Sequence, residues 1–134
     1  MKRFLAFTLI ALVLGACSGS KETDQGEQVQ INPEFAQYIS AFTGGTVGAD
    51  ASIKVQFNQS VTEENRENTG ADIFKFDPAV DGDVNWVDDR TIEFVPKENL
   101  TAGIRYKAEL DISELIEVED DLEVFAFNFR TLPQ

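Results

Sequence analysis

The chain has 134 residues, with 24 acidic and 11 basic side chains, a formal charge of −13 and no histidine. The few cations, which we expect to be scattered, argue against binding to nucleic acid or to an anionic lipid surface, and the absence of histidine excludes Ser-His-Asp and Cys-His catalysis. The single cysteine, Cys17, permits no internal disulfide. We therefore expect a protein that is not an enzyme and has no catalytic residues, cofactor or metal.

The first 16 residues are arranged like a secretory signal. Two cations precede an apolar run over residues 4–14, which is too short for a permanent membrane span. The run ends in Leu14-Gly15-Ala16-Cys17, a small-small-Cys junction that predicts cleavage before Cys17 and lipidation of its thiol. The alternative is an ordinary signal in which Cys17 is incidental. Lipidation predicts a cell-envelope protein, anchored in the outer membrane and facing the periplasm or the surface.

Residues 17–30 contain almost no aliphatic side chains and many small or charged ones. Such a composition buries too little apolar surface to fold, so it predicts a flexible tether. The 118 residues from Cys17 onward allow one domain, which we place at residues 31–134.

The first half of this domain predicts a short helical turn that leads into a strand, followed by two further strands. Asn32 and Pro33 are typical of a helix start, and the helical pattern ends near Ile39. Glycines then interrupt the chain before residues 52–57, where apolar and polar residues alternate as in a half-buried strand. A polar loop over residues 58–70 separates this strand from the next, at residues 73–76, which Pro78 and Gly82 end.

The second half predicts four more strands and one ambiguous segment. Residues 84–86 and 91–95 are expected to form strands joined by a tight turn at Asp88-Asp89-Arg90. Residues 104–110 alternate cleanly, residues 112–116 are ambiguous between a helical turn and a crossover, and residues 124–131 form an aromatic-rich strand. The fold class is therefore all-β, an immunoglobulin-like antiparallel sandwich of about seven strands.

A possible calcium loop starts at Asp81, because residues 81, 83 and 85 place oxygen ligands at alternate positions. The EF-hand pattern fails, since Trp86 occupies the position that requires glycine and Ile92 the position that requires glutamate. Two readings remain, a solvated acidic turn or a looser calcium site that draws on acidic residues of this region: Asp77, Asp81, Asp83, Asp88 and Asp89.

The aromatic residues are expected to form the core. Trp86 lies within a strand pattern, where a single aromatic side chain is more often buried than a ligand platform. The same holds for the phenylalanines of the predicted strands, namely Phe74, Phe76, Phe94, Phe125, Phe127 and Phe129. A row of exposed aromatic rings would instead indicate a surface for sugar stacking.

The spacing from Trp86 and Thr91 through Phe94 and Pro96 to Gly103 and Tyr106 resembles bacterial Ig-like domains of the SbsA type. The runs 38–45, 53–57 and 74–78 add to this likeness, which is strongest to the first domain of lipidated alpha-2-macroglobulin-like proteins from Bacteroidetes. The resemblance covers about residues 31–134.

The resemblance implies a membrane-proximal spacer domain of a protease inhibitor. Full-length members of that family trap proteases, many through a thioester built on a Cys-x-Glu-Gln motif, which this chain lacks. We therefore expect a non-enzymatic, lipid-anchored Ig-like module whose partners are the membrane and further macroglobulin-type domains. The alternative is a stand-alone surface lipoprotein that binds a protein or glycan.

Overall fold

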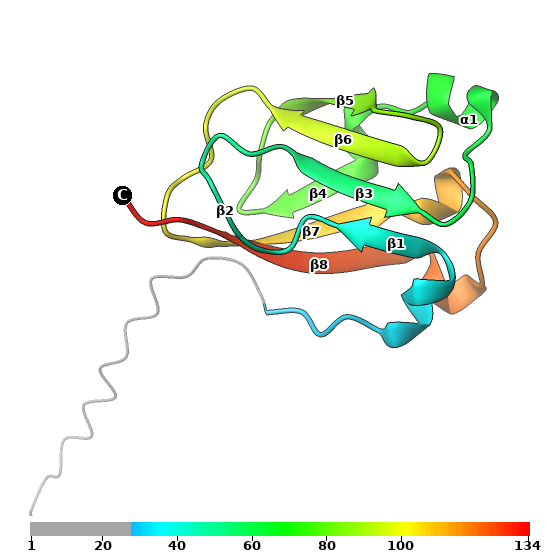
Figure 1. The fold of residues 1–134 in the computed structure, drawn as a ribbon, viewed down its shortest axis with the longest axis horizontal. Coiled ribbons are helices and arrows are strands. Elements are labelled where there is room, and N and C mark those ends of the chain that lie inside the picture. The colour runs from blue at the N-terminus through cyan, green and yellow to red at the C-terminus, as the bar shows by residue number, and fades with distance from the viewer. Residues whose placement is uncertain (1–27) are drawn as a thin grey trace, which may run out of the picture.

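The computed structural model describes residues 28–134, so the predicted signal and Cys17 lie outside the described part. Two four-stranded sheets pack face to face (Figure 1). One sheet has the order β1-β3-β6-β5 and the other β2-β8-β7-β4. The strands are β1 (Ile39–Phe42), β2 (Gly45–Val47), β3 (Ile53–Phe57), β4 (Phe74–Asp77), β5 (Gly82–Trp86), β6 (Thr91–Pro96), β7 (Arg105–Asp111) and β8 (Val124–Thr131).

The predicted all-β, immunoglobulin-like sandwich is confirmed, with eight strands where about seven were expected. The sheet β1-β3-β6-β5 has the strand order of the A-B-E-D sheet of an immunoglobulin domain. In the other sheet, β4, β7 and β8 occupy the places of the C, F and G strands. All strand pairs are antiparallel except β2 with β8, which is parallel.

Alternating side chains of β3, β7 and β8 form most of the core between the sheets. The apolar residues of β3 are fully buried while Lys54 and Gln56 are exposed. In β8 the rings of Phe125, Phe127 and Phe129 all point inward, as predicted, and each is at most 1% exposed. Phe125 packs against Phe35, with ring centroids 5.0 Å apart, which ties the N-terminal 3-10 helix η1 (Pro33–Gln37) to the sandwich.

A tyrosine corner fixes the connection between β6 and β7. The hydroxyl of Tyr106 accepts a hydrogen bond at 2.9 Å from the backbone N–H of Thr101, five residues earlier, an arrangement typical of immunoglobulin sandwiches. The fully buried Thr131 hydroxyl donates to the carbonyl of Thr101 and accepts from the N–H of Ile104. The end of β8 and this corner are therefore held together by buried hydrogen bonds.

Three local predictions were wrong. The glycine-rich segment expected to be irregular contains β2, which pairs with β8 because Gly45 adopts a φ of 65° and turns the chain from one sheet to the other. The predicted loop over residues 58–70 contains the short helix α1 (Glu63–Glu67), capped by Thr62. Gly82 begins β5 instead of ending a strand, since its missing Cβ lets the backbone lie against Phe94 and Val95.

The remaining elements agree with the prediction. Asn32 caps η1 by accepting the N–H of Glu34 at 3.0 Å, and β5 and β6 form a hairpin in which Trp86 lies opposite Ile92. The ambiguous residues 112–116 begin with the 3-10 helix η3 (Ile112–Glu114), and a further 3-10 helix, η4 (Asp120–Leu122), precedes β8. Among residues 28–134, no helix is long and apolar enough to cross a membrane.

Candidate functional site

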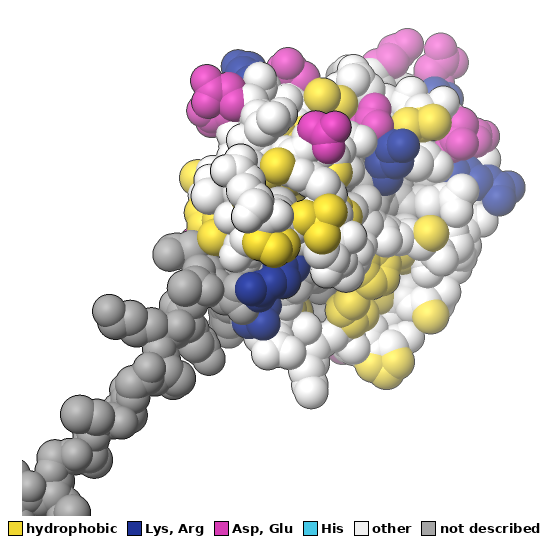
Figure 2. All heavy atoms as spheres, turned by 60° about the vertical axis from the view of Figure 1, so that its left-hand side comes forward, with side chains coloured by type: hydrophobic (Ala, Val, Ile, Leu, Met, Phe, Trp, Pro, Cys, Tyr) yellow, Lys and Arg dark blue, Asp and Glu magenta, His cyan; other side chains and the backbone are white. Residues whose placement is uncertain are grey.

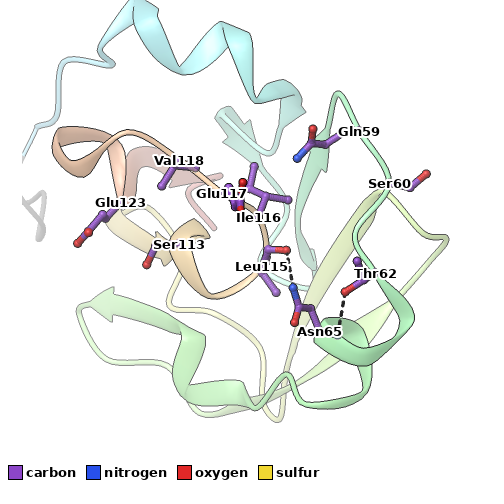
Figure 3. A pocket seen from close by; sticks show the side chains of 10 residues that line it. All are labelled: Gln59, Ser60, Thr62, Asn65, Ser113, Leu115, Ile116, Glu117, Val118 and Glu123. Carbon is purple, nitrogen blue, oxygen red and sulfur yellow. Dashed lines mark hydrogen bonds between the residues drawn. The ribbon is translucent and has the colours of Figure 1, made fainter.

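A hollow opens at one end of the sandwich, between the β3–β4 connection (residues 58–73) and the β7–β8 connection (residues 112–123) (Figure 3). These connections correspond to the B–C and F–G loops of an immunoglobulin domain, two of the loops that bind antigen in variable domains. The cavity has a volume of about 880 Å³. Its lining consists of Gln59, Ser60, Thr62, Asn65, Ser113, Leu115, Ile116, Glu117, Val118 and Glu123.

Asn65 joins the two walls of the hollow. Its Nδ2 donates a hydrogen bond to the carbonyl oxygen of Leu115 at 3.0 Å, fifty positions away in the sequence (Figure 3). Thr62 caps the N-terminus of α1 by accepting the N–H of Asn65 at 3.2 Å, and the Thr69 hydroxyl donates to the Asn65 carbonyl at 2.6 Å. The helix is only five residues long, so these side-chain bonds hold Asn65 in place.

The β7–β8 wall is held by its own bonds. The N–H groups of Ile112 and Ser113 donate to the carbonyl of Glu123 and close the base of the connection. Leu115 and Ile116 are buried and tie the wall to the core, while the hydroxyl of Tyr38 accepts the N–H of Glu119 at 3.1 Å. The hollow therefore has preformed walls.

The β5–β6 turn (residues 87–90) supports the β3–β4 wall. The carboxylate of Asp89 accepts a hydrogen bond from the Ser60 hydroxyl at 2.7 Å. Asp88 accepts the backbone N–H of Arg90 at 2.9 Å, and this bond, together with one from the Thr91 side chain, lowers the pKa of Asp88 below its usual value.

Most of the negative charge of the domain lies at this end. The three connections 58–73, 87–90 and 112–123 contain twelve acidic and two basic side chains, a net charge of −10, whereas residues 28–134 together carry −13. Two of the acids, Glu117 and Glu123, line the hollow itself. Such a field repels anionic molecules, nucleic acid included.

The five acidic residues considered for calcium do not converge. Asp88 and Asp89 lie in the β5–β6 turn and are used there as hydrogen-bond acceptors, whereas Asp77 ends β4 and Asp83 lies on the exposed side of β5. Within residues 28–134, no three acidic, histidine or cysteine side chains come close enough to hold a metal ion.

The aromatic residues mostly lie where the sequence predicted. Five of the six strand phenylalanines are buried in the core, whereas Phe76 and Trp86 are only partly buried at its margin. Phe42 is the one exposed aromatic ring among the described residues, and it leans on Phe125 and Phe127. The described surface therefore offers no row of rings for sugar stacking.

The hollow itself was missed by sequence analysis. Thr62 followed by Asn65 has the spacing of a helix cap, which could have indicated α1. The hydrogen-bond partner of Asn65 in the other wall is the backbone carbonyl of Leu115. Every residue has such a carbonyl, so no sequence pattern marks the contact between the two connections.

Comparison with protein families identifies the class of protein to which this fold belongs. Residues 16–115 match the family model described as bacterial Ig domain. The chain is therefore a member of the bacterial Ig domain family. The matched segment ends within the β7–β8 connection, and the structure adds β8 as the last strand of the domain. No curated protein matches the chain in sequence.

Several solved structures with a similar fold are L,D-transpeptidases. An L,D-transpeptidase from Mycobacterium tuberculosis H37Rv has 19% sequence identity and a TM-score of 0.53, over 71% of this chain and 40% of that one. L,D-transpeptidase 3 from Mycobacterium tuberculosis, in complex with a faropenem-derived adduct, has 20% identity and a TM-score of 0.52, over 73% and 39%. The chain thus spans about 40% of these structures, and at such low identity the likeness concerns the fold alone.

Proposed function

We propose that the protein is a non-enzymatic, lipid-anchored Ig-like module, structurally similar to the first domain of alpha-2-macroglobulin-like inhibitors, that positions partner domains at a distance from the membrane. The observation that carries the proposal is the Leu14-Gly15-Ala16-Cys17 junction, followed by a polar segment and a bacterial Ig domain. Several acyl chains on one cysteine would hold such a domain at the membrane.

Two further observations support a spacer role. The fold covers only about 40% of the L,D-transpeptidase structures that resemble it, so it also occurs as one part of longer chains. The chain has no histidine, and the hollow has no thiol in its lining, which leaves it without a cysteine nucleophile and without a histidine to activate its serine hydroxyls.

Lipidation is tested by Cys17→Ala, with Ser18→Ala as the neighbouring control, in cells fed radiolabelled palmitate. The protein with Cys17 intact should carry label and stay with the membranes, and so should the Ser18→Ala variant. The Cys17→Ala variant should lose both properties. A Cys17→Ala variant that remains labelled in the membrane fraction would contradict the anchor.

The size of the native product tests the spacer role. Antibody raised against residues 31–134 should detect a membrane-bound band many times heavier than 14.9 kDa if the module is part of an inhibitor. A small membrane-bound band would favour the second candidate function, a stand-alone lipoprotein that binds a protein or glycan.

The preformed hollow supports this second candidate. Its lining combines hydroxyl, amide and carboxylate groups with the aliphatic side chains of Leu115, Ile116 and Val118, a mixture typical of binding sites. Gln59 is exposed on its rim, so Gln59→Trp should fill part of the hollow without disturbing the core. Loss of a cross-linked partner in this variant would assign binding to the hollow, and unchanged cross-linking would exclude it.

A further inference from the structure

The two ends of the sandwich differ strongly in charge. The three connections at the end opposite the hollow (residues 48–52, 78–81 and 97–104) contain three acidic and one basic side chain, a net charge of −2, against −10 at the hollow. Figure 2 brings this opposite end forward, and apolar and uncharged side chains cover the centre of the view, with acidic side chains gathered in its upper part. The electrostatic field of the domain therefore attracts cations to the end that carries the hollow.

The hollow holds negative charge that no cation of its own lining balances. The lining includes Glu117 and Glu123 and contains no lysine or arginine. Neither carboxylate makes a hydrogen bond or an ion pair within the described part of the chain. The two cations of this end lie outside the lining. Arg66 uses its Nε to donate a hydrogen bond to the carbonyl of Val61 at 3.1 Å, and Arg90 lies in the β5–β6 turn.

Aliphatic side chains lie beside these carboxylates in the lining. Leu115 and Ile116 are buried and Val118 is partly buried. Figure 3 shows Leu115 and Ile116 between Glu123 on one side of the hollow and Gln59 on the other. A lysine or arginine side chain has the matching build, because its methylene stem packs on apolar surface while its charged end stays with an anion or with water.

We propose that the hollow receives a basic segment of a partner protein, with lysine or arginine side chains directed at Glu117 and Glu123. The proposal rests on the second candidate function, binding of a partner at the hollow, and names the chemistry of that partner. The cavity of about 880 Å³ has the size of a ligand site. The Asn65 bond and the closed base of the β7–β8 connection hold its walls in place, which lowers the entropic cost of binding. No aromatic ring lines the hollow for stacking on a sugar, and this favours a protein over a glycan.

Fluorescence anisotropy of the peptide Lys-Leu-Lys-Leu-Lys, labelled with an uncharged fluorophore, tests the proposal. The peptide is titrated with the full-length protein in neutral detergent micelles at 0.15 M salt. It should bind saturably and about tenfold more tightly than Gln-Leu-Gln-Leu-Gln with the same label.

The carboxylates of the hollow are tested by Glu117→Gln/Glu123→Gln. This variant should raise the Kd for the lysine peptide about fivefold, the effect of two exposed ion pairs. The matched control, Glu119→Gln/Asp121→Asn, removes the same charge from the same connection but outside the lining. It should change the Kd less than about twofold, because salt screens charges beyond about 8 Å. Melting temperatures show that each variant is folded.

Three results would overturn the proposal: no binding of the lysine peptide, equal binding of both peptides, or an equal loss of affinity in the two double variants. The last would assign the attraction to the acidic end as a whole. Gln59→Trp separates these failures from a failure of the function itself. If this variant still loses its cross-linked partner, the hollow binds a partner that is not basic. If chitotriose, a neutral oligosaccharide, binds the native protein and not Gln59→Trp, while the lysine peptide binds neither, the hollow is a glycan site.

Discussion

The side-chain amide of Asn65 donates a hydrogen bond to the carbonyl of Leu115 and thereby joins the two connections that wall the hollow. Asn65 is only partly buried, yet the carbonyl that it satisfies belongs to a residue that is 2% exposed. Buried polar groups cost free energy when they lose their partner. This contact between the two connections therefore adds to the bonds that hold each wall separately.

Asn65→Ala should lower the free energy of unfolding by about 1 kcal/mol, because the Leu115 carbonyl loses its partner. Urea unfolding measures this loss, and faster amide exchange over residues 112–118 should accompany it. Asn68→Ala is the matched control, since Asn68 is exposed and its side chain makes no hydrogen bond within the described part of the chain. Equal stability of the two variants would mean that the contact does not hold the walls together.

Gly82→Ala should destabilise the domain by about 2 kcal/mol or more, the range of overpacking in a rigid core. A Cβ at this position would lie 2.4 Å from the carbonyl oxygen of Val95 and 2.6 Å from the ring of Phe94. Gly48→Ala is the control, because the only atom that its Cβ would meet closely is the end of the Asp50 side chain, at 2.8 Å. Thermal unfolding should separate the two variants clearly, and a near-native melting temperature for Gly82→Ala would contradict the close approach of β5 and β6.

Thr131→Val should cost about 1–3 kcal/mol, since it removes a fully buried hydroxyl from the carbonyl of Thr101 and from the N–H of Ile104. Val retains the shape of Thr, so the change tests the hydrogen bonds and not the packing. Thr46→Val, at an exposed position of β2, should change the free energy of unfolding by less than about 0.5 kcal/mol. Denaturant unfolding measures the free energy of unfolding of both variants. An equal loss of stability in the two would contradict the prediction.

The strands that the sequence predicted well are those whose alternation reflects burial. In β3, β7 and β8 every second side chain enters the core, so the pattern and the structure have the same cause. β2 was missed because Gly45-Thr46-Val47 shows no such alternation and is a strand only through its parallel pairing with β8. The hollow was missed for a related reason, since it depends on which connections the fold brings together at one end of the sandwich. Asn65 and Leu115 are fifty positions apart in sequence and become neighbours only in the folded domain.

The effect of Asp88 on stability should depend on pH with a defined sign. The Arg90 N–H stabilises the ionised carboxylate, so the pKa of Asp88 is lower in the folded than in the unfolded chain. Its contribution is therefore complete above the unfolded pKa of about 3.9 and is lost as the pH falls through the lower, folded value. Asp88→Ala should be less stable than the native protein at pH 6, and the difference should shrink as the pH falls below about 4.

Urea unfolding at pH 6 and at pH 3 measures this change, with Asp121→Ala as the control for lost negative charge. Asp121 is exposed at the same acidic end of the domain and accepts no hydrogen bond within the described residues. Its removal should relieve repulsion and leave the domain as stable at pH 6 as before, or more so. The stability difference between the native protein and Asp88→Ala could instead stay the same at pH 6 and pH 3. That result would assign the loss to turn geometry, because a hydrogen bond to the ionised carboxylate weakens when the carboxylate is protonated.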